Sequence, residues 1–187
     1  MRLFVAIQIP ERVRTTFGSL VDEFGVIDPR IKWVKSENLH ITLKFLGRAD
    51  TSQLASVVEV LSTIARSAHP IILDFVGVGC FPNARKPNIL WAGIEASANV
   101  RTIVREMDQR LAVLGFPLEE REFTPHVTLG RFDKTPYAGN LQIAIGRNTS
   151  REFGGFKALD FHLVESTLKS SGAEYTILHS FPFTAEA

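Results

Sequence analysis

This sequence has one cysteine, almost no net charge and no long apolar run, and each of these absences excludes a class of protein. Cys80 is the single cysteine among 187 residues, so the chain has no internal disulfide and no cysteine cluster for zinc. Lys and Arg outnumber Asp and Glu by only 21 to 20, so any basic surface must be local. We therefore expect a protein of the reducing cytoplasm, with Cys80 as a buried apolar residue.

The apolar segments are short and evenly spread. The first stops at Pro10, far below the roughly 20 residues that cross a bilayer, so we expect no membrane contact. No linker or biased segment divides the chain, and 45% hydrophobic with 22% charged residues is typical of a globular protein. We expect residues 1–187 to form one bilobal domain that is a monomer.

Hydrophobic periodicity predicts strands alternating with helices. Apolar residues recur at helical spacing in residues 10–25, 51–69 and 97–114. Alternating or continuous apolar runs predict strands at residues 2–9, 31–34, 39–46, 71–80, 89–95, 121–132, 141–145, 153–168 and 175–183. Several connections are expected to be hairpins, including a turn at residues 170–172 and a longer loop at residues 81–88. We therefore predict an α+β fold: two similar lobes of mainly antiparallel sheet with helices on the outer faces.

One short pattern occurs twice, once in each half of the chain. His40-Ile41-Thr42-Leu43 and His126-Val127-Thr128-Leu129 each place a histidine two residues before a threonine. Successive side chains of a strand point to opposite faces, so His and Thr share one face while the apolar residues point to the other. Each half therefore presents one reactive face.

Paired histidines suit a reaction that needs both an acid and a base near neutral pH. Opening a cyclic phosphate is such a reaction, because the attacking water loses a proton while the departing oxygen gains one. Imidazole, with a reference pKa of about 6.5, can do either. A threonine hydroxyl roughly 6 to 7 Å along the strand can donate a hydrogen bond to a non-bridging phosphate oxygen. We interpret His40 and His126 as catalytic, and Thr42 and Thr128 as phosphate-binding.

Longer motifs around these two elements resemble one family. They are residues 3–7, 38–47, 79–82, 90–93 and 123–131, which are spread over most of the chain. On these motifs the sequence resembles the two-histidine (2H) phosphoesterases. Within them it resembles the RNA 2′,3′-cyclic phosphodiesterases, also described as 2′-5′ RNA ligases.

The resemblance implies a fold, a reaction and individual roles. It implies a central groove between the lobes, and hydrolysis of a terminal RNA 2′,3′-cyclic phosphate to a 2′-phosphate without metal or cofactor. The implied partner is a single-stranded RNA 3′ end, such as one derived from tRNA. His40 would donate a proton to the 3′-oxygen and His126 would activate water, and an RNA 5′-hydroxyl in place of water would join two ends.

The resemblance also assigns phosphate binding to Arg131, five residues after His126. Strict alternation from Thr128 points Arg131 to the opposite face, so this role requires a bulge or the end of the strand near Gly130. Lys44 has the same parity as His40 and Thr42, and it is interpreted equally as a groove residue or as a solvated lysine.

Other classes of function stay open at this point. A metal hydrolase is disfavoured because the sequence has no His-x-x-x-His or similar cluster, and threonine is a poor ligand. A non-catalytic module that binds RNA ends would use the same residues to hold a terminal phosphate. Within the enzyme class, cyclic phosphates of small nucleotides or of ADP-ribose are alternative substrates.

The remaining polar and aromatic candidates lack the repeated context. We expect His69, His162 and His179 to be structural or surface residues, although His162 could approach a groove. Arg85 and Lys86 could contribute to a basic path for RNA. Four rings are expected in the core or in a groove wall, namely Trp33, Phe81, Trp91 and Tyr175.

Overall fold

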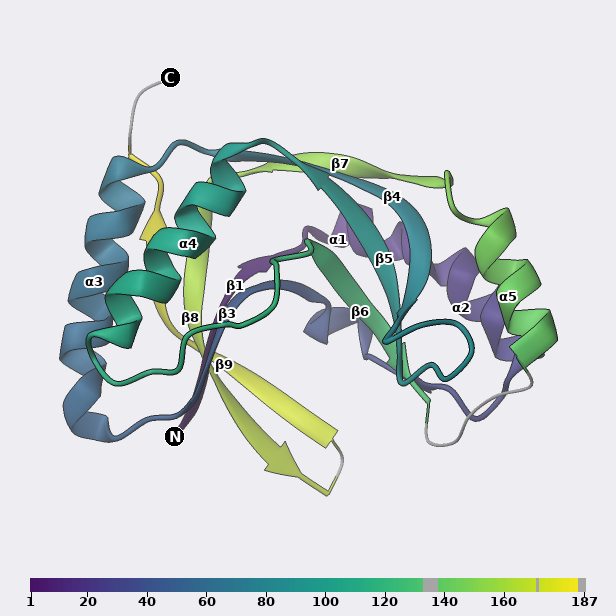
Figure 1. Cartoon of the computed structure of the whole chain (residues 1–187), viewed down its shortest axis with the longest axis horizontal. Coiled ribbons are helices and arrows are strands. Elements are labelled where there is room, and N and C mark those ends of the chain that lie inside the picture. The colour runs from purple at the N-terminus through teal and green to yellow at the C-terminus, as the bar shows by residue number, and fades with distance from the viewer. Residues whose placement is uncertain (133–137, 171, 185–187) are drawn as a thin grey trace.

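A single curled antiparallel sheet organises the molecule (Figure 1). The computed structural model describes residues 1–132, 138–170 and 172–184, so Ser171 of the expected turn lies outside the described residues. In this part of the chain the strand order is β7-β4-β5-β6-β3-β1-β8-β9, with β2 paired beside β6. The strands are β1 (Arg2–Gln8), β2 (Lys32–Trp33), β3 (His40–Arg48), β4 (Ile71–Phe81), β5 (Ile89–Ala96), β6 (His126–Arg131), β7 (Glu152–Ala158), β8 (Asp160–Lys169) and β9 (Gly172–Pro182).

The helices pack on the face of the sheet that carries the hydrophobic core. Val57, Leu61 and Ile64 of α3 are fully buried at helical spacing, and they join the same core cluster as Leu3, Val5 and Ile7 of β1. The helices are α1 (Glu11–Arg14), α2 (Gly18–Ile27), α3 (Leu54–Ser67), α4 (Asn99–Ala112) and α5 (Ala138–Arg147), with 3-10 turns η1 (Thr15–Phe17), η2 (Ser36–Asn38) and η3 (Thr51–Gln53). The predicted helices and the α+β class are confirmed. A capping box of Asp50 and Gln53 begins the segment of the second predicted helix.

The predicted strand at residues 141–145 is wrong, because this segment belongs to α5. Its apolar residues alternate loosely with polar ones, which mimics a strand. In the structure Leu141, Ala144 and Asn148 are buried at a spacing of three to four residues, as on one side of a helix. The amide of Asn148 donates to the Ala144 carbonyl at 2.8 Å and closes the end of the helix.

Strands β3 and β6 lie at the middle of the sheet and join its two halves. Their register shows one antiparallel pair, Ile41 with Val127, and both side chains are buried. Strands β7 and β8 follow each other in the chain but have distant places in the strand order: β7 pairs with β4 at one edge, while β8 pairs with β1 near the other. The two His-x-Thr strands are therefore neighbours at the centre.

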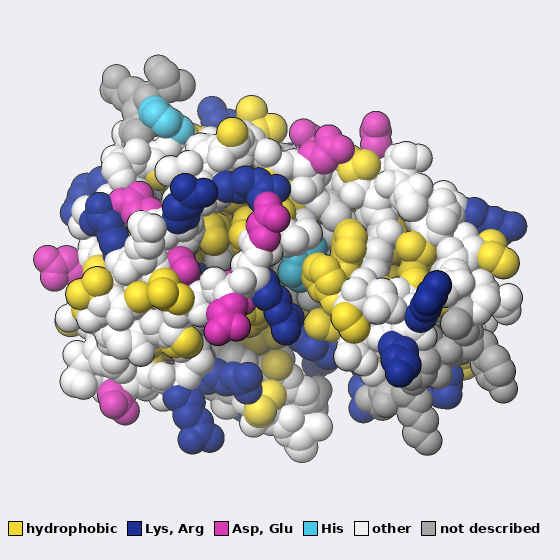
Figure 2. Space-filling view, in the orientation of Figure 1, with side chains coloured by type: hydrophobic (Ala, Val, Ile, Leu, Met, Phe, Trp, Pro, Cys, Tyr) yellow, Lys and Arg dark blue, Asp and Glu magenta, His cyan; other side chains and the backbone are white. Residues whose placement is uncertain are grey.

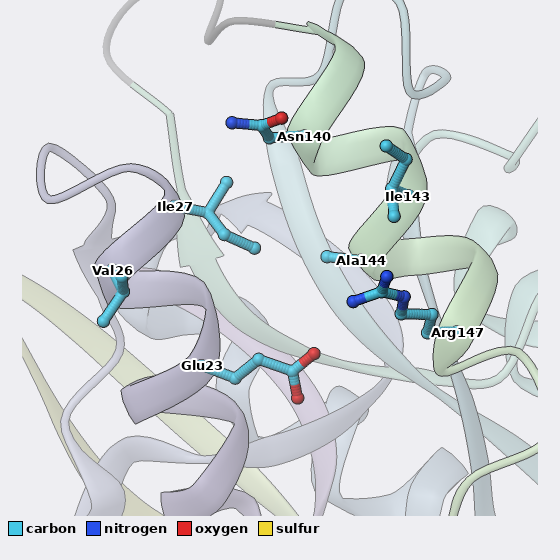
Figure 3. Close-up of a pocket in the computed structure, with 7 residues that line it drawn as sticks. All are labelled: Glu23, Val26, Ile27, Asn140, Ile143, Ala144 and Arg147. Atoms are coloured by element: carbon cyan, nitrogen blue, oxygen red, sulfur yellow. The ribbon is translucent and has the colours of Figure 1, made fainter.

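A surface depression lies between α2 and α5, away from this centre (Figure 3). Its walls include exposed Val26 and Ile143, with Glu23 and Arg147 at its polar side. None of the predicted site residues lines it. Among the described residues, no helix is both long and apolar enough to cross a membrane.

Candidate active site

The register of β3 and β6 brings both His-x-Thr elements together on one face. Ile41 pairs with Val127, so continuing the antiparallel register by one residue places His40 opposite Thr128 and Thr42 opposite His126. Directly opposed side chains of neighbouring strands have Cβ atoms about 4.5 to 5.5 Å apart. The four polar side chains therefore form a square, with the histidines on one diagonal and the threonines on the other.

Each histidine is oriented by a backbone carbonyl two residues before it. Nδ1 of His40 lies 2.7 Å from the carbonyl oxygen of Asn38, and Nδ1 of His126 lies 2.8 Å from that of Thr124. A carbonyl can only accept a hydrogen bond, so Nδ1 carries a proton in both rings. Nε2 is then the reactive nitrogen, with a lone pair in the neutral form and a proton in the imidazolium form.

Aromatic rings surround both imidazoles. The His40 ring has its centroid 4.9 Å from that of Phe4 and 5.1 Å from that of Tyr175. The His126 ring lies 4.9 Å from Phe81 and 6.4 Å from Trp91, measured in the same way. Phe81, Trp91 and Tyr175 thus form the walls around the imidazoles. Phe4 is an addition that the sequence concealed within an apolar strand.

Two glycines make room for the ring of Trp91. A Cβ atom on Gly79 would lie 2.2 Å from a ring carbon of Trp91, and one on Gly93 would lie 3.3 Å from another. Gly79 is the cross-strand partner of Trp91, and Gly93 is the partner of His126. The indole therefore occupies the space that side chains would otherwise take beside His126.

Burial lowers the pKa of both catalytic candidates. Desolvation is the main cause for His40, the Asn38 carbonyl partly opposes it, and the nearby charge of His126 lowers the pKa of His40 further. Desolvation likewise lowers the pKa of His126, against the opposing hydrogen bond to Thr124. The effect of His126 on His40 means that both rings do not hold a proton readily at the same time.

A β-bulge decides the direction of Arg131. Trp91 pairs with Thr128 and Leu90 pairs with Gly130, so Leu129 is an extra residue in β6. Leu129 and Gly130 both lie on the core side, and the exposed Arg131 returns to the face of Thr128. The bulge that the predicted role of Arg131 requires is present.

A matching bulge in β3 decides the direction of Lys44, and it turns this side chain away from the face of His40 and Thr42. Ala6 pairs with Thr42 and Val5 pairs with Lys44, so Leu43 is the extra residue of β3. Lys44 is only 5% exposed, and its amino group bonds to Asp108 of α4 and to the Pro117 carbonyl at 2.6 Å. Its side chain therefore points into the helical layer and is neither solvated nor part of a groove.

The other predicted residues are separate from the square. His162 lies on the same face, two strands from Thr42, and its Nδ1 is 2.9 Å from the hydroxyl of Ser180. His69 and His179 are exposed, and Arg85 and Lys86 are exposed in the loop between β4 and β5. Cys80 is buried, and burial raises the pKa of its thiol to about 12, which suits the expected structural role.

Comparisons with known proteins show the family of this chain. A model of the family described as LigT like Phosphoesterase matches residues 7–91 and 94–175. The chain belongs to the LigT-like phosphoesterase family. Two relatives named RNA 2′,3′-cyclic phosphodiesterase illustrate this membership. The protein of Methanocaldococcus jannaschii is 35% identical over 95% of this chain and 98% of its own. The protein of Archaeoglobus fulgidus is 32% identical over 97% of this chain and 99% of its own.

Solved structures place the LigT-like phosphoesterase fold over the whole chain. A crystal structure of a Thermus thermophilus protein is similar with a TM-score of 0.81 at 29% identity, and covers 100% of both chains. The structure of Escherichia coli LigT complexed with 3′-AMP has a TM-score of 0.78 at 22% identity over 98% of both chains, which concerns the fold alone. The predicted family and architecture are confirmed.

Proposed function

We propose that this LigT-like phosphoesterase hydrolyses the terminal 2′,3′-cyclic phosphate of single-stranded RNA to a 2′-phosphomonoester. The observation that carries the proposal is the square of two histidines and two threonines at the joint of β3 and β6. A phosphate at its centre has one imidazole on each side along one diagonal. That arrangement suits in-line displacement, in which the attacking and leaving oxygens lie on opposite sides of phosphorus.

The chemistry needs one proton transfer at each histidine. Nε2 of His126 takes a proton from water as the water oxygen bonds to phosphorus. The bond from phosphorus to the 3′-oxygen breaks, and that oxygen takes the proton from Nε2 of His40. The hydroxyls of Thr42 and Thr128 donate to the two non-bridging oxygens, and Arg131 neutralises their charge. The same steps with an RNA 5′-hydroxyl in place of water join two ends through a 2′-5′ phosphodiester.

Protonation of His40 depends on the substrate. Burial and the charge of His126 lower its pKa in the free protein, and a bound phosphate anion raises it again. Since kcat/KM reports the free enzyme, its bell-shaped pH profile should reach its maximum on the acid side of neutrality. The alkaline limb of the kcat profile should lie at higher pH, because kcat reports the bound complex.

The direct test is incubation with an RNA that ends in a 2′,3′-cyclic phosphate, followed by separation of 2′-phosphate, 3′-phosphate and joined products. We expect the 2′-phosphate, and a loss of several orders of magnitude in His40→Ala and His126→Ala with unchanged circular dichroism. Unaltered RNA, still bound tightly by both variants, would instead indicate a binding module. Faster turnover of nucleoside or ADP-ribose cyclic phosphates would indicate the small-molecule alternative.

A modified substrate separates the acid from the base. A cyclic phosphate with sulfur in place of the bridging 3′-oxygen releases a thiolate, which leaves without protonation because thiols are far more acidic than alcohols. We expect this substrate to restore turnover in His40→Ala and not in His126→Ala. Restoration of the His126 variant alone would reverse the two roles.

Dependence on a metal is tested independently. The described residues contain no group of three His, Cys, Asp or Glu side chains placed to hold a metal ion. We expect full activity after exhaustive treatment with EDTA, because the two imidazoles perform both proton transfers. Activity that disappears in EDTA and returns with a divalent cation would favour a metal hydrolase.

A further inference from the structure

The face that carries His40 and Thr42 continues along β1 and β3 beyond the square. Ala6 pairs with Thr42, Phe4 pairs with Phe45, and Arg2 pairs with Arg48. Paired residues of neighbouring strands share a face, and residues 2, 4 and 6 alternate with the core residues Leu3 and Val5. Phe4, Phe45, Arg2 and Arg48, here called the β1–β3 strip, therefore share the face of the catalytic square.

Two bulges in β3 produce this alignment. Leu43 and Leu46 are extra residues relative to β1, and both are buried on the core side. Without the first bulge Phe45 would point into the helical layer, and Gly47, with φ of 75°, provides the turn of the second. Each cross-strand pair on this face forms one level: Phe4 with Phe45 is the first level beyond Ala6 and Thr42, and Arg2 with Arg48 is the second. Successive levels are two residues of β1 apart, which is roughly 7 Å.

Phe45 is an exposed aromatic surface at the first level of the strip. Its ring is 64% exposed and lies 6.3 Å from the buried ring of Phe4, which contacts His40. Phe45 occupies in β3 the position that Arg131 occupies in β6, because each residue follows its threonine across an equivalent bulge. One half of the site thus presents a cation there, and the other half presents a flat apolar ring.

Arg2 and Arg48 form the second level, and both are exposed. Like charges directly opposed on neighbouring strands are destabilising. Within the described residues, neither arginine forms an ion pair with an acidic side chain. Figure 2 shows Lys and Arg side chains in dark blue at the lower left, near the end of the chain that Figure 1 marks N. Two opposed guanidinium groups without an acidic partner can bind an anion such as phosphate between them.

We propose that the β1–β3 strip binds the terminal nucleoside and the phosphate on its 5′ side. With the cyclic phosphate in the square, the base stacks on Phe45 and the next phosphate lies between Arg2 and Arg48. The order of charge, ring and charge follows that of phosphate, base and phosphate along an RNA strand. The protein therefore prefers RNA chains to single nucleotides. This inference rests on the proposed function, and it assigns the residues that hold the RNA chain next to that site.

The test compares adenosine 2′,3′-cyclic phosphate, which has a free 5′-hydroxyl, with a dinucleotide and a longer RNA that end in the same group. We expect the double substitution Arg2→Gln, Arg48→Gln to lower the ratio of kcat/KM for the dinucleotide to that for the nucleoside by about 10-fold or more. The salt dependence of RNA binding should become less steep by about 0.7 in the log-log slope for each phosphate that the variant no longer neutralises. Phe45→Ala should lower kcat/KM for all three substrates by about 5- to 100-fold, and Phe45→Trp should retain it.

Matched controls separate the strip from general charge and surface effects. Arg105→Gln removes an exposed positive charge from α4, and Val113→Ala removes an exposed apolar side chain beyond the end of α4. Neither control should change the substrate ratio or the salt slope. An unchanged ratio and slope in the double variant would overturn the strip while leaving the hydrolysis proposal intact.

A protein that hydrolyses none of the substrates would refute the proposed function without deciding the strip. Binding then decides it, measured by fluorescence anisotropy with a labelled RNA that ends in a 3′-phosphate. Weaker and less salt-dependent binding by the double variant than by Arg105→Gln would support the strip. Equal binding would refute it.

Discussion

At the scale of single residues, a backbone carbonyl two residues before each histidine orients its imidazole ring. The carbonyls of Asn38 and Thr124 hold the Nδ1 protons of His40 and His126, so both rings direct Nε2 toward the same space. The threonines stand between them and add hydroxyl donors without adding charge. Under the proposed function, an acid and a base of the same residue type differ through the substrate oxygens that they face, rather than through their own surroundings alone.

The threonines provide the first prediction at this scale. Thr42→Val and Thr128→Val keep the shape of each side chain and remove its hydroxyl, so each should lower kcat/KM by roughly 10- to 1,000-fold. Thr→Ser at the same positions keeps the donor and should preserve most of the activity. Steady-state kinetics on the cyclic-phosphate RNA provide the measurement. Full activity in a valine variant would remove that hydroxyl from the mechanism.

His162 provides a second prediction, on stability. Burial lowers its pKa, and Asp160 partly opposes this. Between the usual pKa near 6.5 and the lowered value, the unfolded chain binds a proton that the folded chain refuses, so stability is full above this window and falls as pH falls through it. The urea midpoint should therefore drop between pH 7.5 and pH 5.5, and it should drop less in His162→Asn. Equal drops in both proteins would contradict this interpretation.

At the scale of elements, β-bulges determine which side chains share a face with the two histidines. Leu129 of β6 returns Arg131 to the catalytic face, and Leu43 of β3 removes Lys44 from it and exposes Phe45. The same device in two equivalent strands thus presents different chemistry, because the residues that follow the bulge differ. The ends of β3 and β6 provide the asymmetry that the two His-x-Thr elements lack.

The packing of β4 against β5 supports a prediction at this scale. Gly79→Ala would place a methyl group 2.2 Å from the Trp91 ring, so the indole must move from its place beside His126. We expect a loss of about 1 to 3 kcal/mol in unfolding free energy together with reduced kcat. Gly25→Ala is the control, because its Cβ meets nothing within 4 Å in helix α2, and it should be neutral or stabilising. A Gly79 variant as stable and active as the control would contradict this role of Trp91.

For the whole molecule, the site lies where the two halves of one sheet meet. The register joins β3 to β6 at Ile41 and Val127, yet the buried residues on the core side of both halves belong to one cluster. We therefore propose that residues 1–187 behave as one folding unit, despite the bilobal arrangement. Separation of the halves would expose this shared core and destroy the square at the same time.

The prediction at this scale concerns cooperativity. Trp33 and Trp91 belong to β2 and β5, on the β6 side of the joint, so tryptophan fluorescence reports that half of the sheet. Far-ultraviolet circular dichroism reports both halves. The two signals should give coincident urea transitions with a single midpoint. A fluorescence transition that is displaced from the dichroism transition would indicate two independent domains.

Much of the fold and the site could be predicted because local periodicity carries it. The stripe of α3 and the alternation around His40 and His126 depend on neighbours within a few residues, and the structure confirms both. The strand predicted at residues 141–145 was wrong, since a short run of apolar residues fits either period and packing decides between them. The orienting carbonyls carry no side-chain signal, and Phe4 was hidden in a strand that is apolar on both faces.

The sequence by itself determined the reactive groups, their placement on strands and the family to which they belong, because residue type and spacing are local properties of the chain. Tertiary structure alone decided how these groups meet. Strand register places each histidine opposite the other element's threonine, and bulges select Arg131 and Phe45 over Lys44. Register and bulges arise from pairing between segments distant in sequence, and one residue of displacement turns a side chain to the opposite face.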